Sequence, residues 1–62
     1  MSDEAATIIR DSITEFSRVQ NWMLAIKDKD SAVHKSMYER YLELKVTLNS
    51  LGVNLTELDR VK

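Results

Sequence analysis

The sequence predicts an all-α fold in which an antiparallel helical hairpin is followed by a short C-terminal helix. The chain of 62 residues contains one glycine and no proline, so few positions interrupt a helix. Apolar side chains recur at alternating steps of four and three residues, which is the spacing of one helix face. A single domain of this size, residues 1–62, buries little surface and has no cysteine to stabilise it. We therefore expect two hairpins to associate as a dimer that resembles a four-helix bundle.

The first helix is predicted over residues 3–27. Ser2 can cap it, and Asp3 and Glu4 then lie in the first turn, where the helix dipole favours acidic side chains. The predicted buried seam consists of Ala5, Ile9, Ser12, Phe16, Val19, Met23 and Ile26. Three flanking positions are also apolar, namely Ile8, Ile13 and Trp22. An apolar face of this width needs more than one neighbouring helix to cover it.

The second helix is predicted over residues 31–51, after a polar stretch at 27–31 that includes the capping candidates Asp30 and Ser31. A connection this short implies that the two helices run antiparallel. The predicted seam consists of Val33, Met37, Tyr41, Leu44, Leu48 and Leu51. A second apolar ridge runs beside it, at a spacing of four residues, and consists of Tyr38, Leu42 and Val46. This ridge needs a neighbour of its own.

Gly52 is predicted to end the second helix in a left-handed conformation, with Val53 then returning to contact Leu48. Asn54 and Glu57 are spaced as in a capping box, in which the first side chain caps a new helix. We therefore expect a third helix of about two turns over residues 55–61. Its apolar positions are Leu55, Leu58 and Val61.

No residue pattern predicts catalysis, a cofactor or a metal site. His34 has no neighbouring nucleophile, so a partly exposed histidine is the simpler interpretation. Glu39 and Glu43 lie one turn apart, but the Glu-x-x-His pairs of di-iron bundles are missing, which favours a solvated face. Asp28 and Asp30 resemble the start of a calcium loop without its glycine and closing glutamate, so we interpret them as loop and capping residues.

Charge and composition exclude other classes of function. Nine Lys and Arg face ten Asp and Glu, and the basic residues are scattered, which makes nucleic acid an unfavoured partner. Trp22, Tyr38 and Tyr41 are accordingly interpreted as core or interface residues, not as platforms for bases. No apolar stretch has membrane-spanning length, and the acidic N-terminus does not resemble a signal peptide. We expect a cytoplasmic protein.

The sequence thus predicts a small non-enzymatic protein-interaction module, an adaptor or regulator of bacterial or phage type. Its expected partner is a second copy, with a different protein chain as the alternative. The expected interface residues are Ile8, Trp22, Tyr38, Leu42 and Val46.

Two resemblances leave a nucleic-acid accessory protein as the other interpretation. In length and predicted design the chain resembles the plasmid copy-number modulator Rop, a helical hairpin that dimerises into a four-helix bundle and modulates RNA. The last quarter of the chain, Leu48 to Lys62, contains Leu51-Gly52-Val53 followed by Arg60 and resembles the C-terminal end of some phage terminase small subunits. The second resemblance would imply a packaging factor.

Overall fold

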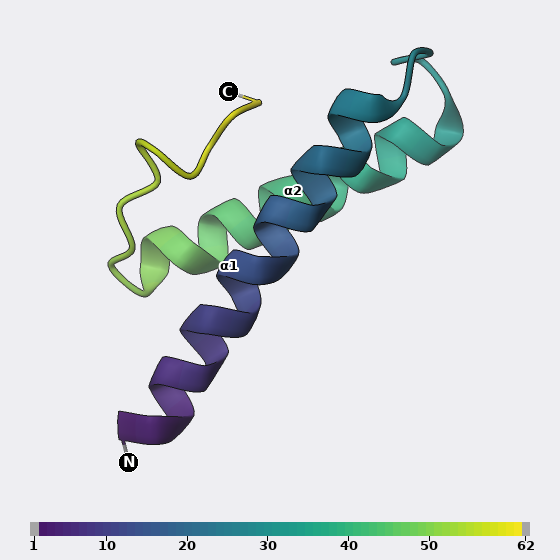
Figure 1. The fold of residues 1–62 in the computed structure, drawn as a ribbon. Coiled ribbons are helices and arrows are strands. Elements are labelled where there is room, and N and C mark those ends of the chain that lie inside the picture. The colour runs from purple at the N-terminus through teal and green to yellow at the C-terminus, as the bar shows by residue number, and fades with distance from the viewer. Residues whose placement is uncertain (1, 62) are drawn as a thin grey trace.

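The fold is a helical hairpin, in a computed structural model that describes residues 2–61 and, for side chains, residues 4–61. Helix α1 spans Ser2–Ala25 and helix α2 spans Ala32–Ser50. The two helices run antiparallel and cross near their middles, and the last residues fold back along them (Figure 1). No strand occurs within residues 2–61. The predicted all-α hairpin is confirmed.

The turn between the helices follows the predicted capping chemistry. The Ser31 side chain accepts a hydrogen bond from the backbone N–H of His34 at 3.1 Å, so Ser31, and not Asp30, is the N-cap of α2. Helix α1 ends two residues before its predicted end, at Ala25. Lys29 Nζ donates to the carbonyl oxygen of Met23 at 2.6 Å, which places a cation at the negative end of the α1 dipole.

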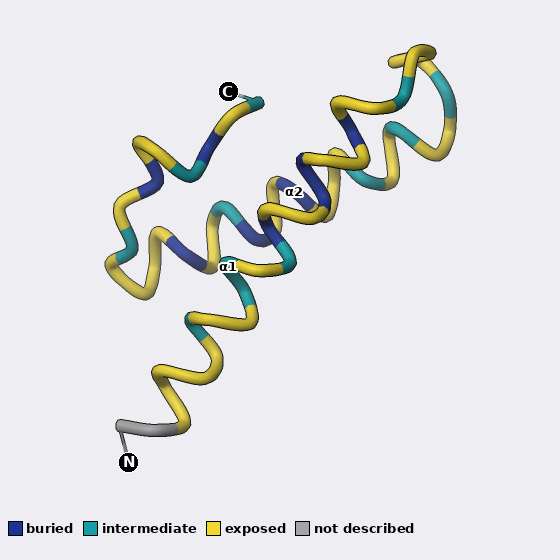
Figure 2. The backbone as a smooth tube through the Cα atoms, in the orientation of Figure 1, coloured by how far each residue is buried: buried dark blue, intermediate teal, exposed yellow. Residues whose placement is uncertain are grey.

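The core lies where the two helices cross. Its buried apolar side chains are Phe16, Val19, Met23, Tyr41, Leu44, Leu48 and Leu55. The rings of Phe16 and Tyr41 stack across the helix interface, with centroids 5.4 Å apart. Figure 2 shows that burial is concentrated at this crossing, whereas the N-terminal turns of α1 extend past α2 and are largely exposed.

The predicted seams are wrong at their outer ends. Ala5 is exposed, Val33 is 58% exposed and Leu51 is 43% exposed. Two helices that cross at an angle are in contact around the crossing and separate on either side of it. Heptad-like spacing therefore continues on each helix beyond the point where the other helix can cover it.

The predicted third helix over 55–61 is also wrong. Residues 53–61 form a strap with a single turn, closed by a 2.9 Å hydrogen bond from the Asp59 N–H to the Leu55 carbonyl. The Asn54 side chain accepts from the N–H of Thr56, at 2.9 Å, as in an Asx-turn, but the chain continues only as that single turn. Instead of continuing a helix, the end of the strap is hydrogen-bonded to α1.

Gly52 ends α2 as predicted. Its φ is 81°, in the left-handed region that glycine adopts without steric cost. The Gly52 N–H donates to the Asn49 carbonyl and the Val53 N–H donates to the Leu48 carbonyl, both at 3.0 Å. These two bonds define a Schellman ending, and they direct the chain back towards the helices.

We expect Gly52→Val to lower the free energy of unfolding by about 1 kcal/mol or more, because a β-branched residue resists positive φ. No atom lies within 4 Å of a Cβ built at this position, so the cost comes from the backbone alone. Gly52→Asn tolerates this conformation better and should be milder. Urea denaturation compares the three proteins, and equal midpoints for Val and Gly would contradict the assigned ending.

Candidate interaction surface

Among the side chains of residues 4–61, eight large apolar ones remain substantially exposed, and they include all five predicted interface residues. Of these five, Val46 is 65% exposed, Ile8 55%, Trp22 49%, Tyr38 43% and Leu42 41%. The others are Leu24, Val33 and Leu51. Scattered surface leucines are normal in monomeric proteins, so the arrangement of these side chains decides what they indicate.

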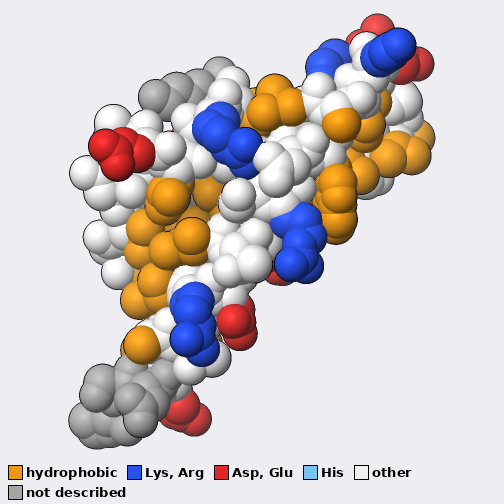
Figure 3. Space-filling view, viewed as in Figure 1, with side chains coloured by type: hydrophobic (Ala, Val, Ile, Leu, Met, Phe, Trp, Pro, Cys, Tyr) orange, Lys and Arg blue, Asp and Glu red, His pale blue; other side chains and the backbone are white. Residues whose placement is uncertain are grey.

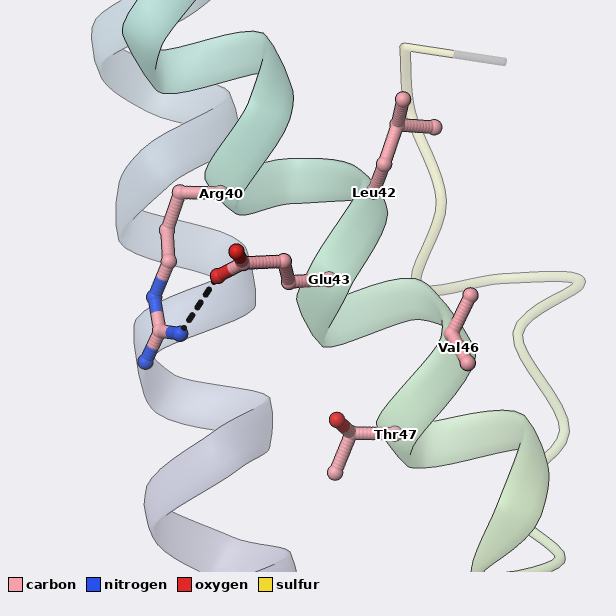
Figure 4. Close-up of a pocket in the computed structure, with 5 residues that line it drawn as sticks. All are labelled: Arg40, Leu42, Glu43, Val46 and Thr47. Carbon is pink, nitrogen blue, oxygen red and sulfur yellow. Dashed lines mark hydrogen bonds and ion pairs between the residues drawn. The ribbon is translucent and has the colours of Figure 1, made fainter.

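Three of the exposed side chains form a continuous stripe on α2, which we call the ridge: Tyr38, Leu42 and Val46. At about 100° per residue, Leu42 lies roughly 160° around the helix from the buried Leu44. Leu42 and Val46 therefore face away from α1, whereas Tyr38 lies beside the core, with its ring stacked on that of Tyr41 at 5.6 Å between centroids. Leu42 and Val46 also line an open groove of about 580 Å³ together with Arg40, Glu43 and Thr47. In Figure 4, Leu42 and Val46 point away from α1, whereas Arg40 points towards it.

The remaining two predicted interface residues lie elsewhere, on α1. Ile8 and Trp22 are 14 positions apart in the sequence, which corresponds to about 21 Å along the helix axis. Trp22 lines a separate open groove with polar and charged side chains of α1, among them Glu15 and Arg18. On the face drawn in Figure 3, hydrophobic side chains likewise occur in several patches with charged groups between them. The structure thus assembles the ridge but places Ile8 and Trp22 outside it.

An ion-pair network joins the two helices on their exposed side. Arg40 donates to both carboxylate oxygens of Glu15, at 2.6 and 2.8 Å, and to Glu43 at 3.0 Å. The pKa of Arg40 is raised and that of Glu15 lowered, in each case chiefly by the hydrogen bond between them. Exposed pairs of this kind contribute little stability, so we interpret the network as fixing the register of the hairpin. No group of three or more potential metal ligands occurs among the described residues.

Sequence reasoning missed Gln20, which is fully buried and holds the strap. Its amide Nε2 donates to the Leu58 carbonyl at 2.9 Å and to the Phe16 carbonyl at 3.3 Å. Its Oε1 accepts the backbone N–H groups of Arg60, at 2.5 Å, and Val61, at 3.1 Å. Helical spacing could have identified it, because Gln20 lies four residues after Phe16 and is therefore a polar residue on the core face of α1.

A second buried polar group fixes the strap to α2. Asp59, 5% exposed, accepts a hydrogen bond from the Tyr41 hydroxyl at 2.7 Å and pairs with Lys45 Nζ at 2.8 Å. Outside the core, Arg60 donates to the Asn21 side chain at 2.7 Å and to the Ser17 carbonyl at 2.9 Å. The strap is thus attached to both helices by side chains that recognise its backbone and its charges.

Alkaline pH is expected to destabilise the fold. Burial, together with the hydrogen bond to Asp59, raises the pKa of Tyr41 above its ordinary 10.0. The hydrogen bond to Asp59 also raises the pKa of Lys45 above 10.5. Because the folded pKa values exceed the unfolded ones, this stabilisation is complete below about pH 10 and is lost as the pH rises through the folded values.

The measurement is urea denaturation at a series of pH values from about 9 to 12. We expect the free energy of unfolding to fall across this range, and Tyr41→Phe to lessen the decline because its ring cannot ionise. An unchanged decline in the Phe variant would show that Tyr41 ionisation does not contribute.

Comparison with protein families, with curated proteins and with solved structures finds no match for this chain. Within residues 2–61, neither helix is long and apolar enough to cross a membrane.

Proposed function

We propose that this protein is a small non-enzymatic interaction module of the cytosol that associates with a second copy of itself through the ridge. The observation that carries the proposal is the exposed stripe of Tyr38, Leu42 and Val46, none of which belongs to the buried cluster and of which Leu42 and Val46 face away from α1. Burying one large aliphatic side chain contributes roughly 1.5–3 kcal/mol. Leaving several of them in water is a substantial loss for a domain this small.

The size of the exposed surface supports the same proposal. The accessible surface is 4569 Å², whereas a compact monomer of this mass has about 4,100 Å². The difference reflects the elongated shape, with extents of 42 × 19 × 16 Å. A hairpin of these proportions exposes more surface than a compact domain of the same mass.

The side chains of the ridge suit a twofold-symmetric contact. Ridges spaced at four residues pack into one another in the commonest class of helix crossing, at about −50°. If the twofold axis passes near Leu42, the large Tyr38 of each copy meets the smaller Val46 of the other. The twofold axis then places one large and one small side chain, Tyr38 and Val46, in contact at each end of the interface. This complementarity in size favours a second copy over an unrelated helix.

Charge favours a protein partner over nucleic acid. Of the nine Lys and Arg residues, four are engaged in bonds described within residues 4–61, namely Lys29, Arg40, Lys45 and Arg60. Those cations are less available for phosphate contacts, on which nucleic-acid affinity depends. A gel-shift titration at two salt concentrations would detect such contacts, and strongly salt-dependent binding would favour the accessory-protein alternative.

The test is the double variant Leu42→Glu with Val46→Lys. We expect it to be a monomer with reduced helicity, because charges in the ridge prevent association that stabilises the fold. The melting temperature of the unsubstituted protein should rise with protein concentration, since folding and association are then linked. Sedimentation velocity and circular dichroism measure the two effects.

A matched control carries the same charges on another face of α2. Ala32→Glu with Ser36→Lys places the charges four residues apart, as in the test variant, at exposed positions outside the ridge and its groove, and should leave association intact. If the unsubstituted protein sediments as a compact, stable monomer at high micromolar concentration, self-association through the ridge is wrong.

A further inference from the structure

The strap, residues 53–61, is attached to the hairpin as a separate unit. It contains one turn and one side-chain bond of its own, from the Thr56 N–H to Asn54, and Val53 bonds the Leu48 carbonyl of α2. Its long-range polar contacts are made with side chains of α1 and α2 and with the Ser17 carbonyl. Leu55 is buried in the core, and Val53, Leu58 and Val61 pack against it. The strap therefore occupies a slot that the two helices provide and contributes no regular structure to either of them.

Two residues, Leu51 and Gly52, connect the strap to α2, and Gly52 carries the left-handed turn. The Schellman ending at Gly52 requires a φ of 81°, and a change there would carry the strap away without breaking a helical hydrogen bond of α1. An open hinge of this kind is the usual starting point for exchange of identical segments between copies.

The chemistry of the slot specifies what it binds. Gln20 presents an amide donor for a carbonyl and an amide oxygen for two successive backbone N–H groups. Tyr41 and Lys45 together present a hydroxyl donor and a cation for one carboxylate. The apolar floor accepts a leucine, as it does Leu55. A ligand of the slot must therefore be a peptide segment that carries a leucine and an acidic side chain. Its backbone must also present one carbonyl and two successive N–H groups to Gln20.

We propose that the slot also binds residues 53–61 of a second copy, so that two hairpins exchange straps. The strap makes the same contacts with Gln20, Tyr41 and Lys45 whether it lies in its own chain or in the other one. Only the backbone conformation of the hinge at Gly52 differs between the two arrangements. Within one chain, the short hinge gives the strap an effective concentration on the order of millimolar. Exchange therefore grows with protein concentration. This second interaction site is separate from the ridge and does not depend on association there.

The first test uses a synthetic peptide with the sequence of residues 53–62 and the full-length double variant Asp59→Asn, Arg60→Ala, whose own strap is weakened. We expect saturating peptide to raise its melting temperature by roughly 5 °C or more, because the peptide binds the folded hairpin only. A scrambled peptide of the same composition should have no effect. A double variant that unfolds is still informative, because peptide binding would then restore helicity.

The specificity control is the full-length triple variant Gln20→Ala, Asp59→Asn, Arg60→Ala, which should respond much less to the peptide than the double variant because its slot lacks the amide. A monomeric peptide reports on the slot whether or not the ridge associates, so this result is independent of the proposed function. Absence of any response in the Asp59→Asn, Arg60→Ala chain would overturn the proposal.

Exchange between whole chains is tested with Gly52→Ala. Alanine disfavours the positive φ of the closed hinge but not an open, helical hinge. We expect the dimer dissociation constant in sedimentation equilibrium to fall about tenfold or more relative to the unsubstituted chain. A dissociation constant that is unchanged or higher would overturn exchange, even if the peptide binds.

Discussion

Gln20→Ala is expected to lower the free energy of unfolding by about 2–4 kcal/mol. The substitution removes every hydrogen bond of a fully buried amide and leaves the Leu58 carbonyl and two strap N–H groups without their partner. Unsatisfied buried polar groups cost roughly 1–3 kcal/mol each, although water that enters beside a loosened strap will reduce the total. Urea denaturation followed by circular dichroism measures the loss.

Asn21→Ala is the matched control for Gln20. Asn21 is the next residue in α1 and also bonds the strap, through Arg60, but it is exposed. Its loss should cost less than about 1 kcal/mol, because water replaces an exposed partner. Equal effects of the two substitutions would mean that burial of Gln20 adds nothing to the stability of the strap.

Asp59→Ala is expected to lower the free energy of unfolding by about 3 kcal/mol. The carboxylate is buried, so its removal leaves the Tyr41 hydroxyl inside the core without this acceptor and separates Lys45 from its counter-charge. The effect should lie near the lower end for buried pairs, since the Lys45 side chain is 36% exposed and can turn to solvent. Thermal or urea denaturation measures this loss in the free energy of unfolding.

Asp59→Asn separates the charge from the hydrogen bond at this position. Its side-chain oxygen still accepts from Tyr41, so it should be milder than Asp59→Ala. A double-mutant cycle with Lys45→Met then measures the coupling between the two charges. Additive losses in that cycle would contradict a direct contribution of the ion pair.

The features that local chemistry determines could be predicted from the sequence. Ser31 can accept a hydrogen bond from the first turn of α2, whatever the rest of the chain does. Gly52 is the one residue that takes a positive φ cheaply, and the apolar spacing on both sides fixes which residues are helical. Both helices and their antiparallel order follow from these signals.

The strap could not be predicted because its conformation depends on contacts distant in sequence. Asn54 and Glu57 have the spacing of a helix start, and propensity alone would continue that helix to Val61. Gln20 lies about forty positions away and binds the backbone groups that the helix would have used. A single sequence gives no sign that these two segments meet.

The candidate interface was only partly accessible to the same reasoning. Helical spacing identified the ridge as a stripe apart from the seam, and its three members are exposed together. The spacing of apolar residues does not determine where along their lengths the two helices cross. It could therefore not show that Ile8 lies on turns of α1 that α2 does not contact. Which surface binds a partner remains a prediction for the ridge variants.

The N-terminal turns of α1 have a consequence for how melting curves of this protein are interpreted. Residues 4–11 contain no buried side chain, and a helical segment of this length is marginal in water without tertiary contacts. These turns will fray progressively from the N-terminus as the temperature rises, while the crossing stays intact. The far-ultraviolet signal should therefore slope well before the cooperative transition. Such a pre-transition slope reports end fraying in the native state and is no sign of a populated folding intermediate.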